Sequence, residues 1–142
     1  MLKLLIAVDG SEHALRAIEA VAKMARAGSS LEVILANVRD IPRFYGEVLV
    51  VNIDQIEAAQ KKVQDQVLAD AEERALGCGL TVHSTQRAVG SPAAEIVRMA
   101  AEHGVDQIVI GTHGRGAVGS LFLGSVAQRV ANLSTLPVLL VK

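Results

Sequence analysis

Residues 2–8 read LKLLIAV, an uninterrupted run of β-forming residues with one charge, at Lys3. A strand with one face in water alternates apolar and polar side chains, and this run does not alternate. We therefore expect it in the middle of a sheet that is covered on both faces. Parallel sheets are covered in this way, by the helices that connect their strands.

A helix and a second buried strand follow this run. Ser11 offers an N-cap and Glu12 offers a negative charge in the first helical turn, where both are favourable. Gly28 ends the helix. Residues 31–38 are again mostly apolar and predict the second strand. The apolar positions of the helix are Leu15, Ile18, Val21, Ala22 and Ala25, at helical spacing.

Residues 39–51 are less informative. Pro42 and Gly46 indicate a loop, and residues 48–51 fit either a short strand or an apolar flap. Asn52 and Gln55 form a capping-box pair, which predicts the start of a long helix. The expected buried stripe of this helix is Ile56, Ala59, Val63, Val67, Ala71 and Ala75.

The rest of the chain supplies three more strands and two more helices. Residues 80–87 alternate apolar and polar side chains, as an outer strand does. Ser91 followed by Pro92 is typical of a helix start, and Gly104 ends that helix. The remaining elements are a strand at 107–110, a helix at about 125–133 and a final strand at 137–142.

Strands and helices thus alternate strictly along residues 1–142. This order predicts a single α/β domain with a doubly wound, five-stranded parallel sheet and helices on both faces. In the strand order 3-2-1-4-5, the first and fourth strands are neighbours at the switch point, where such folds bind ligands. Asp9 ends the first strand and Gly111 ends the fourth, so we expect them to meet in one crevice.

Composition narrows the classes of function. The 142 residues carry a net charge of −1, with 51% hydrophobic and 2% aromatic residues. The balanced charge and the shortage of aromatic rings argue against nucleic acid as a partner. Apolar runs are too short to span a membrane, so we expect no membrane insertion. The single cysteine, Cys78, cannot form an internal disulfide, which favours the reducing cytoplasm.

Glycine is concentrated between Gly111 and Gly124. A Walker A loop would need Gly-Lys-Ser or Gly-Lys-Thr, and neither tripeptide occurs. Residues 114–119 match GxGxxG, the dinucleotide fingerprint. That fingerprint belongs after the first strand and is followed about 20 positions later by an acidic residue. Here it follows the fourth strand and no acidic residue occurs beyond Asp106, so we reject the dinucleotide interpretation.

The more informative spacing is Gly111-x2-Gly114-x9-Gly124-Ser125. Glycine lets backbone N–H groups approach an anion closely because it has no Cβ. Gly124 and Ser125 open the last helix, whose free N–H groups and dipole favour phosphate. Arg115 could add a positive charge at the mouth. The alternative is that the glycines only permit a tight turn, but their convergence on a serine at a helix start favours an anion site.

These features resemble the universal stress protein family over nearly the whole chain. The glycine spacing is similar to that of the ATP-binding branch of this family. The residues that carry the resemblance are Asp9-Gly10-Ser11 after the first strand, Gly90-Ser91-Pro92, the glycine spacing and the closing Pro137-Val138 strand.

The resemblance implies a binding site for ATP, with ADP and AMP as alternatives and Mg²⁺ as an optional companion of the phosphates. Val38 would form backbone hydrogen bonds with adenine, and Ala7 would line the same pocket. Asp9 would lie at the base or ribose end. The residues that would hold ribose and phosphates are Gly111, Gly114, Gly124 and Ser125.

We interpret the chain as a nucleotide-binding signalling module of the stress response that acts as a homodimer. The dimer would form through residues 137–142, because this apolar strand lies at the sheet edge and invites pairing. One alternative is a slow ATP hydrolase or self-phosphorylating protein that uses Asp9, Arg115 and His113, which match no known catalytic pattern. Another is a nucleotide-free dimer scaffold. The histidines lack metal-ligand spacing, so we expect no metal site.

Overall fold

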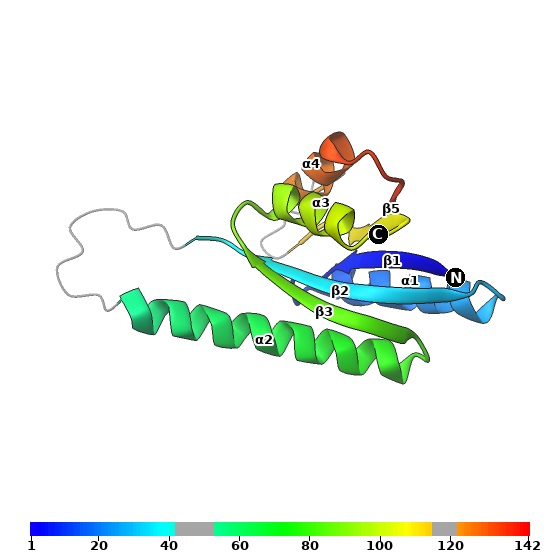
Figure 1. The fold of residues 1–142 in the computed structure, drawn as a ribbon, viewed down its shortest axis with the longest axis horizontal. Coiled ribbons are helices and arrows are strands. Elements are labelled where there is room, and N and C mark those ends of the chain that lie inside the picture. The colour runs from blue at the N-terminus through cyan, green and yellow to red at the C-terminus, as the bar shows by residue number, and fades with distance from the viewer. Residues whose placement is uncertain (42–52, 115–121) are drawn as a thin grey trace.

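The strands and helices alternate from one end of the chain to the other, as the sequence predicts (Figure 1). The computed structural model describes residues 1–41, 53–114 and 122–142. The strands are β1 (Leu2–Ala7), β2 (Leu31–Arg39), β3 (Thr81–Val89), β4 (Gln107–Gly111) and β5 (Val138–Val141). The helices are α1 (Glu12–Arg26), α2 (Ile53–Gly77), α3 (Pro92–Glu102) and α4 (Ser125–Leu133).

The sheet has the predicted order, β3-β2-β1-β4-β5, and all of its pairings are parallel. β1 is central, and its last four residues are buried because helices cover both faces of the sheet. Leu4 and Ile6 pack in the layer of α1 and α2, whereas Leu5 and Ala7 pack in the layer of α3 and α4. The lack of apolar and polar alternation in this strand therefore follows from its position. The predicted doubly wound α/β fold is confirmed.

The predicted buried stripe of α2 is wrong in its first half. Ala59 is exposed and the Val63 side chain is 55% exposed, whereas Gln64 is buried. The first turns of α2 extend past the ends of the strands, so they have no sheet to cover (Figure 1). Asn52, the expected cap of this helix, and the loop at 42–51 lie outside the described residues. The buried positions of α2 are Gln64, Leu68, Ala71 and Ala75.

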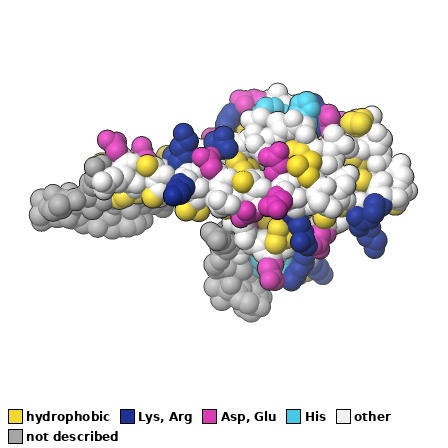
Figure 2. Space-filling view, turned by 90° about the horizontal axis from the view of Figure 1, so that it is seen from below, with side chains coloured by type: hydrophobic (Ala, Val, Ile, Leu, Met, Phe, Trp, Pro, Cys, Tyr) yellow, Lys and Arg dark blue, Asp and Glu magenta, His cyan; other side chains and the backbone are white. Residues whose placement is uncertain are grey.

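Charges of both signs are interspersed on the face of the molecule shown in Figure 2. Ion pairs also connect separate elements, such as Arg74 with Glu19 and Arg87 with Asp65. In the second of these pairs, Nε of Arg87 lies 3.0 Å from Oδ1 of Asp65. This face therefore presents no extended field of one sign. Among the described residues, no helix is both long enough and apolar enough to cross a bilayer.

Candidate functional site

A cavity of about 330 Å³ opens at the carboxyl ends of the strands. β1 pairs with β2 on one side and with β4 on the other, so the winding of the chain reverses here. Ligands of open α/β sheets bind at this point because the loops diverge and leave a crevice. The predicted site residues that line this one cavity are Ala7, Asp9, Val38, Gly111, Gly114, Gly124 and Ser125. Arg115, the remaining predicted residue, lies outside the described part of the chain.

The three glycines of the predicted spacing occupy places where a side chain would collide. A Cβ atom at Gly111 would lie 2.7 Å from Cβ of His13, and one at Gly114 would lie 2.5 Å from Oδ2 of Asp9. A Cβ at Gly124 would lie 3.1 Å from the carbonyl oxygen of Thr112. None of the three has a positive φ angle, so glycine is needed here for space and not for an unusual backbone conformation.

The amino end of α4 forms one wall of the cavity. Its N-cap is Gly124, so no side chain caps the first N–H groups of the helix. The Gly124 amide itself donates to the carbonyl of Thr112 over 2.6 Å, which fixes the entry to the helix beside the end of β4. Ser125 is the first residue of α4 and lines the cavity. Uncapped helical N–H groups, a helix dipole and a hydroxyl together favour an anion.

Asp9 stabilises the turn after β1 and also lines the cavity. Its Oδ1 accepts a hydrogen bond of 2.9 Å from the Ser11 amide, and the Ser11 hydroxyl oxygen in turn accepts from the Ala14 amide over 3.2 Å. Ser11 is therefore the N-cap of α1, as predicted. The carboxylate of Asp9 is held at the start of α1, close to Gly114 of the opposite loop.

The other end of the cavity is apolar and is built on β1, β2 and α3. The Val8 amide donates to the carbonyl of Ala36 over 2.8 Å, and the pairing of β1 with β2 ends at Ala7. The N–H and C=O groups of successive residues point to alternate sides of a strand. Val38 lies two residues after Ala36, so its N–H and C=O also point to the side of β2 on which β1 lies. β1 has ended there, and these groups therefore face the crevice. The apolar side chains at this end are Ala7, Ala36, Val38, Ile96 and Ile110.

Several residues that line the cavity were not predicted to do so. Asp40 directly follows β2, as Asp9 follows β1, and its place after a strand end was the available signal. Asn37 and Ile96 reach the cavity from β2 and α3. His113, for which the sequence left a phosphate contact and a loop-filling role open, lines the cavity with its ring centroid 5.2 Å from that of His13. Across residues 1–41, 53–114 and 122–142, no cluster of His, Cys, Asp and Glu could hold a metal ion.

The fold and this crevice define a doubly wound α/β protein with a cavity at its switch point, where proteins of this class bind ligands. The profile of the Universal stress protein family matches residues 1–142, and the chain belongs to that family.

Individual relatives agree with this assignment. The chain is 36% identical to universal stress protein YxiE of Bacillus subtilis, over 99% of this chain and 98% of that protein. Its structure is similar to that of a universal stress protein in complex with cAMP (TM-score 0.69, 26% identity, covering 99% of this chain and 95% of the other). It is also similar to the universal stress protein from Archaeoglobus fulgidus in complex with dAMP (TM-score 0.64, 26% identity, covering 100% and 98%).

Proposed function

We propose that the chain binds an adenine nucleotide in the crevice between β1 and β4. The observation that carries the proposal is that one cavity joins two chemically different ends. The apolar end at Val38 suits a purine base, and the glycines and Ser125 at the start of α4 suit phosphates. Small-molecule sites generally have volumes of about 300–1,000 Å³, and this cavity of about 330 Å³ is in that range.

The two solved relatives with adenine nucleotides support the choice of base. The spacing of Gly111, Gly114, Gly124 and Ser125 resembles that of the ATP-binding branch of the family, which supports ATP as the nucleotide. ADP and AMP remain the alternatives. Mg²⁺ would enter with the triphosphate, held chiefly by the phosphate oxygens.

We further propose that the protein acts as a nucleotide-responsive binding and signalling module of the stress response, in the cytoplasm. Its one cysteine fits a reducing compartment. An enzyme would need a metal-holding carboxylate, a base and a cation in a concerted arrangement. Asp9, Asp40 and His113 are the titratable groups of the described cavity lining. A slow ATP hydrolase or self-phosphorylating protein that uses Asp9, Arg115 and His113 is the second candidate, and a nucleotide-free dimer scaffold is the third.

The edge strand β5 supports the proposed homodimer. The Ile108 amide donates to the carbonyl of Pro137 over 3.0 Å, and the Thr112 amide donates to that of Val141 over 2.8 Å. Pro137 and Val141 therefore direct their carbonyl groups to β4, and by alternation Val138 and Leu140 of β5 direct their backbone groups away from the sheet. An apolar strand with a free edge can pair with its own copy across a two-fold axis.

Nucleotide binding is tested by thermal unfolding with and without ATP, ADP and AMP, each with and without Mg²⁺. Ligand at about a hundred times its dissociation constant stabilises the folded state by about 2.7 kcal/mol. For a domain of this size the melting temperature would rise by roughly 5–10 °C. Mass spectrometry of ligand released from heat-denatured protein identifies which nucleotide is retained. The proposal is wrong if millimolar nucleotide leaves the melting temperature unchanged.

A further inference from the structure

The buried polar side chains of the described residues are few and belong to Asn37, Gln64 and Thr112, which are 8%, 4% and 4% exposed. Gln64 differs from the other two because it lies on a helix, in the otherwise apolar face that α2 turns to the sheet. Leu68 and Ala71 continue that face. Burying an amide is unfavourable unless its hydrogen bonds are satisfied, so the place of Gln64 calls for an explanation from its partners.

The side-chain nitrogen of Gln64 bonds to the backbone of two neighbouring strands. It donates to the carbonyl of Asn37 on β2 over 3.1 Å and to the carbonyl of Ala88 on β3 over 3.0 Å. A glutamine amide has two N–H donors, and both are used. The Asn37 side chain then donates to the carbonyl of Val8, after β1, over 2.6 Å. These bonds connect three adjacent strands at the end of the sheet that forms the cavity.

The bond to the Asn37 carbonyl bears directly on Val38. The carbonyl of Asn37 and the N–H of Val38 belong to one peptide group, which is planar and trans, so the two point in opposite directions. Fixing the carbonyl toward Gln64 on one side therefore fixes the Val38 N–H toward the crevice on the other. Gln64 itself does not line the cavity, whereas Asn37 and Val38 do.

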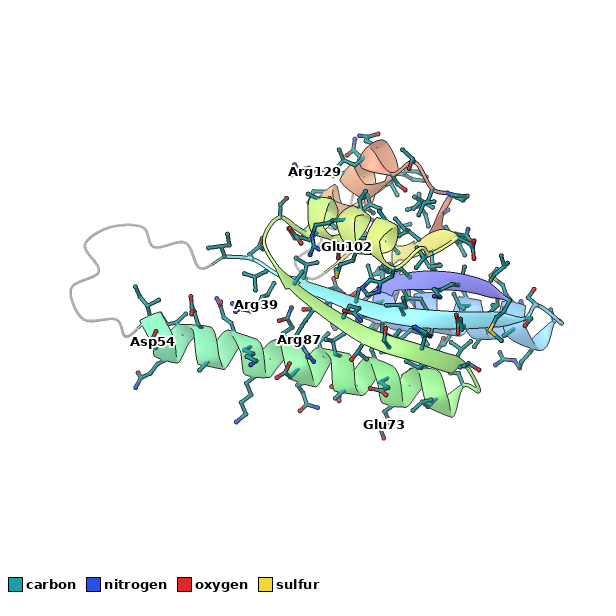
Figure 3. The ribbon with its side chains drawn as sticks, in the orientation of Figure 1. Arg39, Asp54, Glu73, Arg87, Glu102 and Arg129 are labelled. Atoms are coloured by element: carbon teal, nitrogen blue, oxygen red, sulfur yellow. The ribbon has the colours of Figure 1, made fainter. Side chains whose placement is uncertain are left out.

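Two further contacts hold this part of α2 against the strands. Nη1 of Arg39 donates to Oε1 of Gln60 over 3.0 Å, and Nε of Arg87 lies 3.0 Å from Oδ1 of Asp65. Figure 3 shows Arg39 and Arg87 reaching from the strands toward α2. Gln64 is positioned between these contacts along the helix, so its amide is held at a defined place relative to β2.

We infer that Gln64 is a positioning residue that sets the selectivity of the crevice for adenine. The inference rests on the proposed nucleotide-binding function. Adenine presents an acceptor nitrogen beside an amino donor, and the N–H and C=O of Val38 match that pair. Guanine presents an N–H and a carbonyl at the corresponding edge. The same backbone groups would therefore place a donor against a donor and an acceptor against an acceptor. Rejection of such a partner is strong only when the site's polar groups cannot turn away, and Gln64 prevents that turn.

The inference is tested with Gln64→Met, which keeps the approximate volume and removes both donors. Gln66→Met is the matched control, because Gln66 lies on the same helix, is exposed and donates from its side-chain nitrogen to Oδ1 of Asp70 over 2.8 Å. Dissociation constants are measured by calorimetry for ATP, GTP and tripolyphosphate. We expect Gln64→Met to weaken ATP binding about tenfold, a change of about 1.4 kcal/mol. We expect a similar fall in the ATP-over-GTP preference, while tripolyphosphate affinity changes by less than about twofold.

The outcomes separate this inference from the proposed function. If the wild-type protein binds ATP and the Gln64→Met variant keeps the same preference for ATP over GTP, the inference is overturned and the proposed function stands. An equal loss of affinity for ATP and tripolyphosphate also overturns it, because it indicates a general structural role. A wild-type protein that binds no nucleotide overturns the proposed function and the inference with it. If circular dichroism shows that Gln64→Met is unfolded, Gln64→Asn, whose shorter amide cannot span to both carbonyls, takes its place in the same measurements.

Discussion

A Cβ atom on Gly114 would lie 2.5 Å from Oδ2 of Asp9, although the two residues lie far apart in the sequence. Asp9 is in turn held by the amide of Ser11, at the start of α1. The loop after β4 therefore lies so close to β1 that a side chain at residue 114 would have to displace the Asp9 carboxylate. This contact connects the two loops that diverge at the switch point, and the cavity lies between them.

Gly114→Ala is expected to weaken nucleotide binding with little loss of stability. The backbone of Gly114 is compatible with alanine, since its φ angle is not positive, but the new Cβ displaces the Asp9 carboxylate. We expect a loss of affinity of about tenfold, or about 1.4 kcal/mol, by calorimetry. Gly77→Ala is the control, because a Cβ there meets nothing within 4 Å. Equal affinity for Gly114→Ala and wild type would show that Asp9 has no part in the site.

Removal of the anion site at α4 tests the phosphate end. Gly124→Val with Ser125→Ala places a side chain in the expected phosphate space and removes a hydroxyl donor. We expect affinity for ATP to fall about 100-fold or more, about 2.8 kcal/mol. Some loss of stability accompanies the double change, because a Cβ at residue 124 lies 3.1 Å from the Thr112 carbonyl. Ser125→Thr keeps the hydroxyl and should bind nearly as well as wild type. A folded double variant with unchanged affinity would place the phosphates elsewhere.

ATP turnover is expected to be slow, well below the rate of about 10 per second that is typical of enzymes. The described cavity lining offers carboxylates and one imidazole but no metal cluster among the described residues. Phosphate release from saturating ATP and Mg²⁺ measures the rate, with Asp9→Asn as the comparison. Turnover near that typical rate, lost in Asp9→Asn, would place the protein among the ATP hydrolases.

Most strands were predictable because they are short apolar runs with clear boundaries, whereas β3 was predictable because its apolar and polar side chains alternate. Leu2–Ala7 and Leu31–Arg39 are examples, and their strict alternation with helices leaves few topologies. The glycines of the candidate site were predictable for a related reason. A Cβ at Gly111 or Gly114 would lie too close to its neighbours, so the fold requires glycine there, and glycines at a fixed spacing are easily recognised in a sequence. Both signals are local, and the fold brings them together at one edge of the sheet.

Other parts of the molecule could not be predicted from local patterns. Gln64 is buried because its amide reaches two strand carbonyls, and a search for apolar periodicity places the buried stripe on Val63 instead. The contribution of Ile96 to the cavity depends on how α3 packs against β2. Such positions follow from three-dimensional neighbours, which a single sequence does not contain.

The last prediction concerns the homodimer through β5. Leu140→Pro removes an N–H that faces away from the sheet and leaves the bonds to β4 in place, and proline is tolerated on edge strands. Leu140→Val, which keeps the N–H, is the control. By light scattering at micromolar concentration, we expect wild type and Leu140→Val at twice the chain mass of 14.9 kDa and Leu140→Pro near that mass. A monomeric wild type contradicts the dimer, and a folded Leu140→Pro dimer places the interface on another surface. Because β5 is the last strand of the sheet and alternation turns the Leu140 N–H away from β4, we expect the proline to prevent pairing with a second copy and to leave the monomer fold intact.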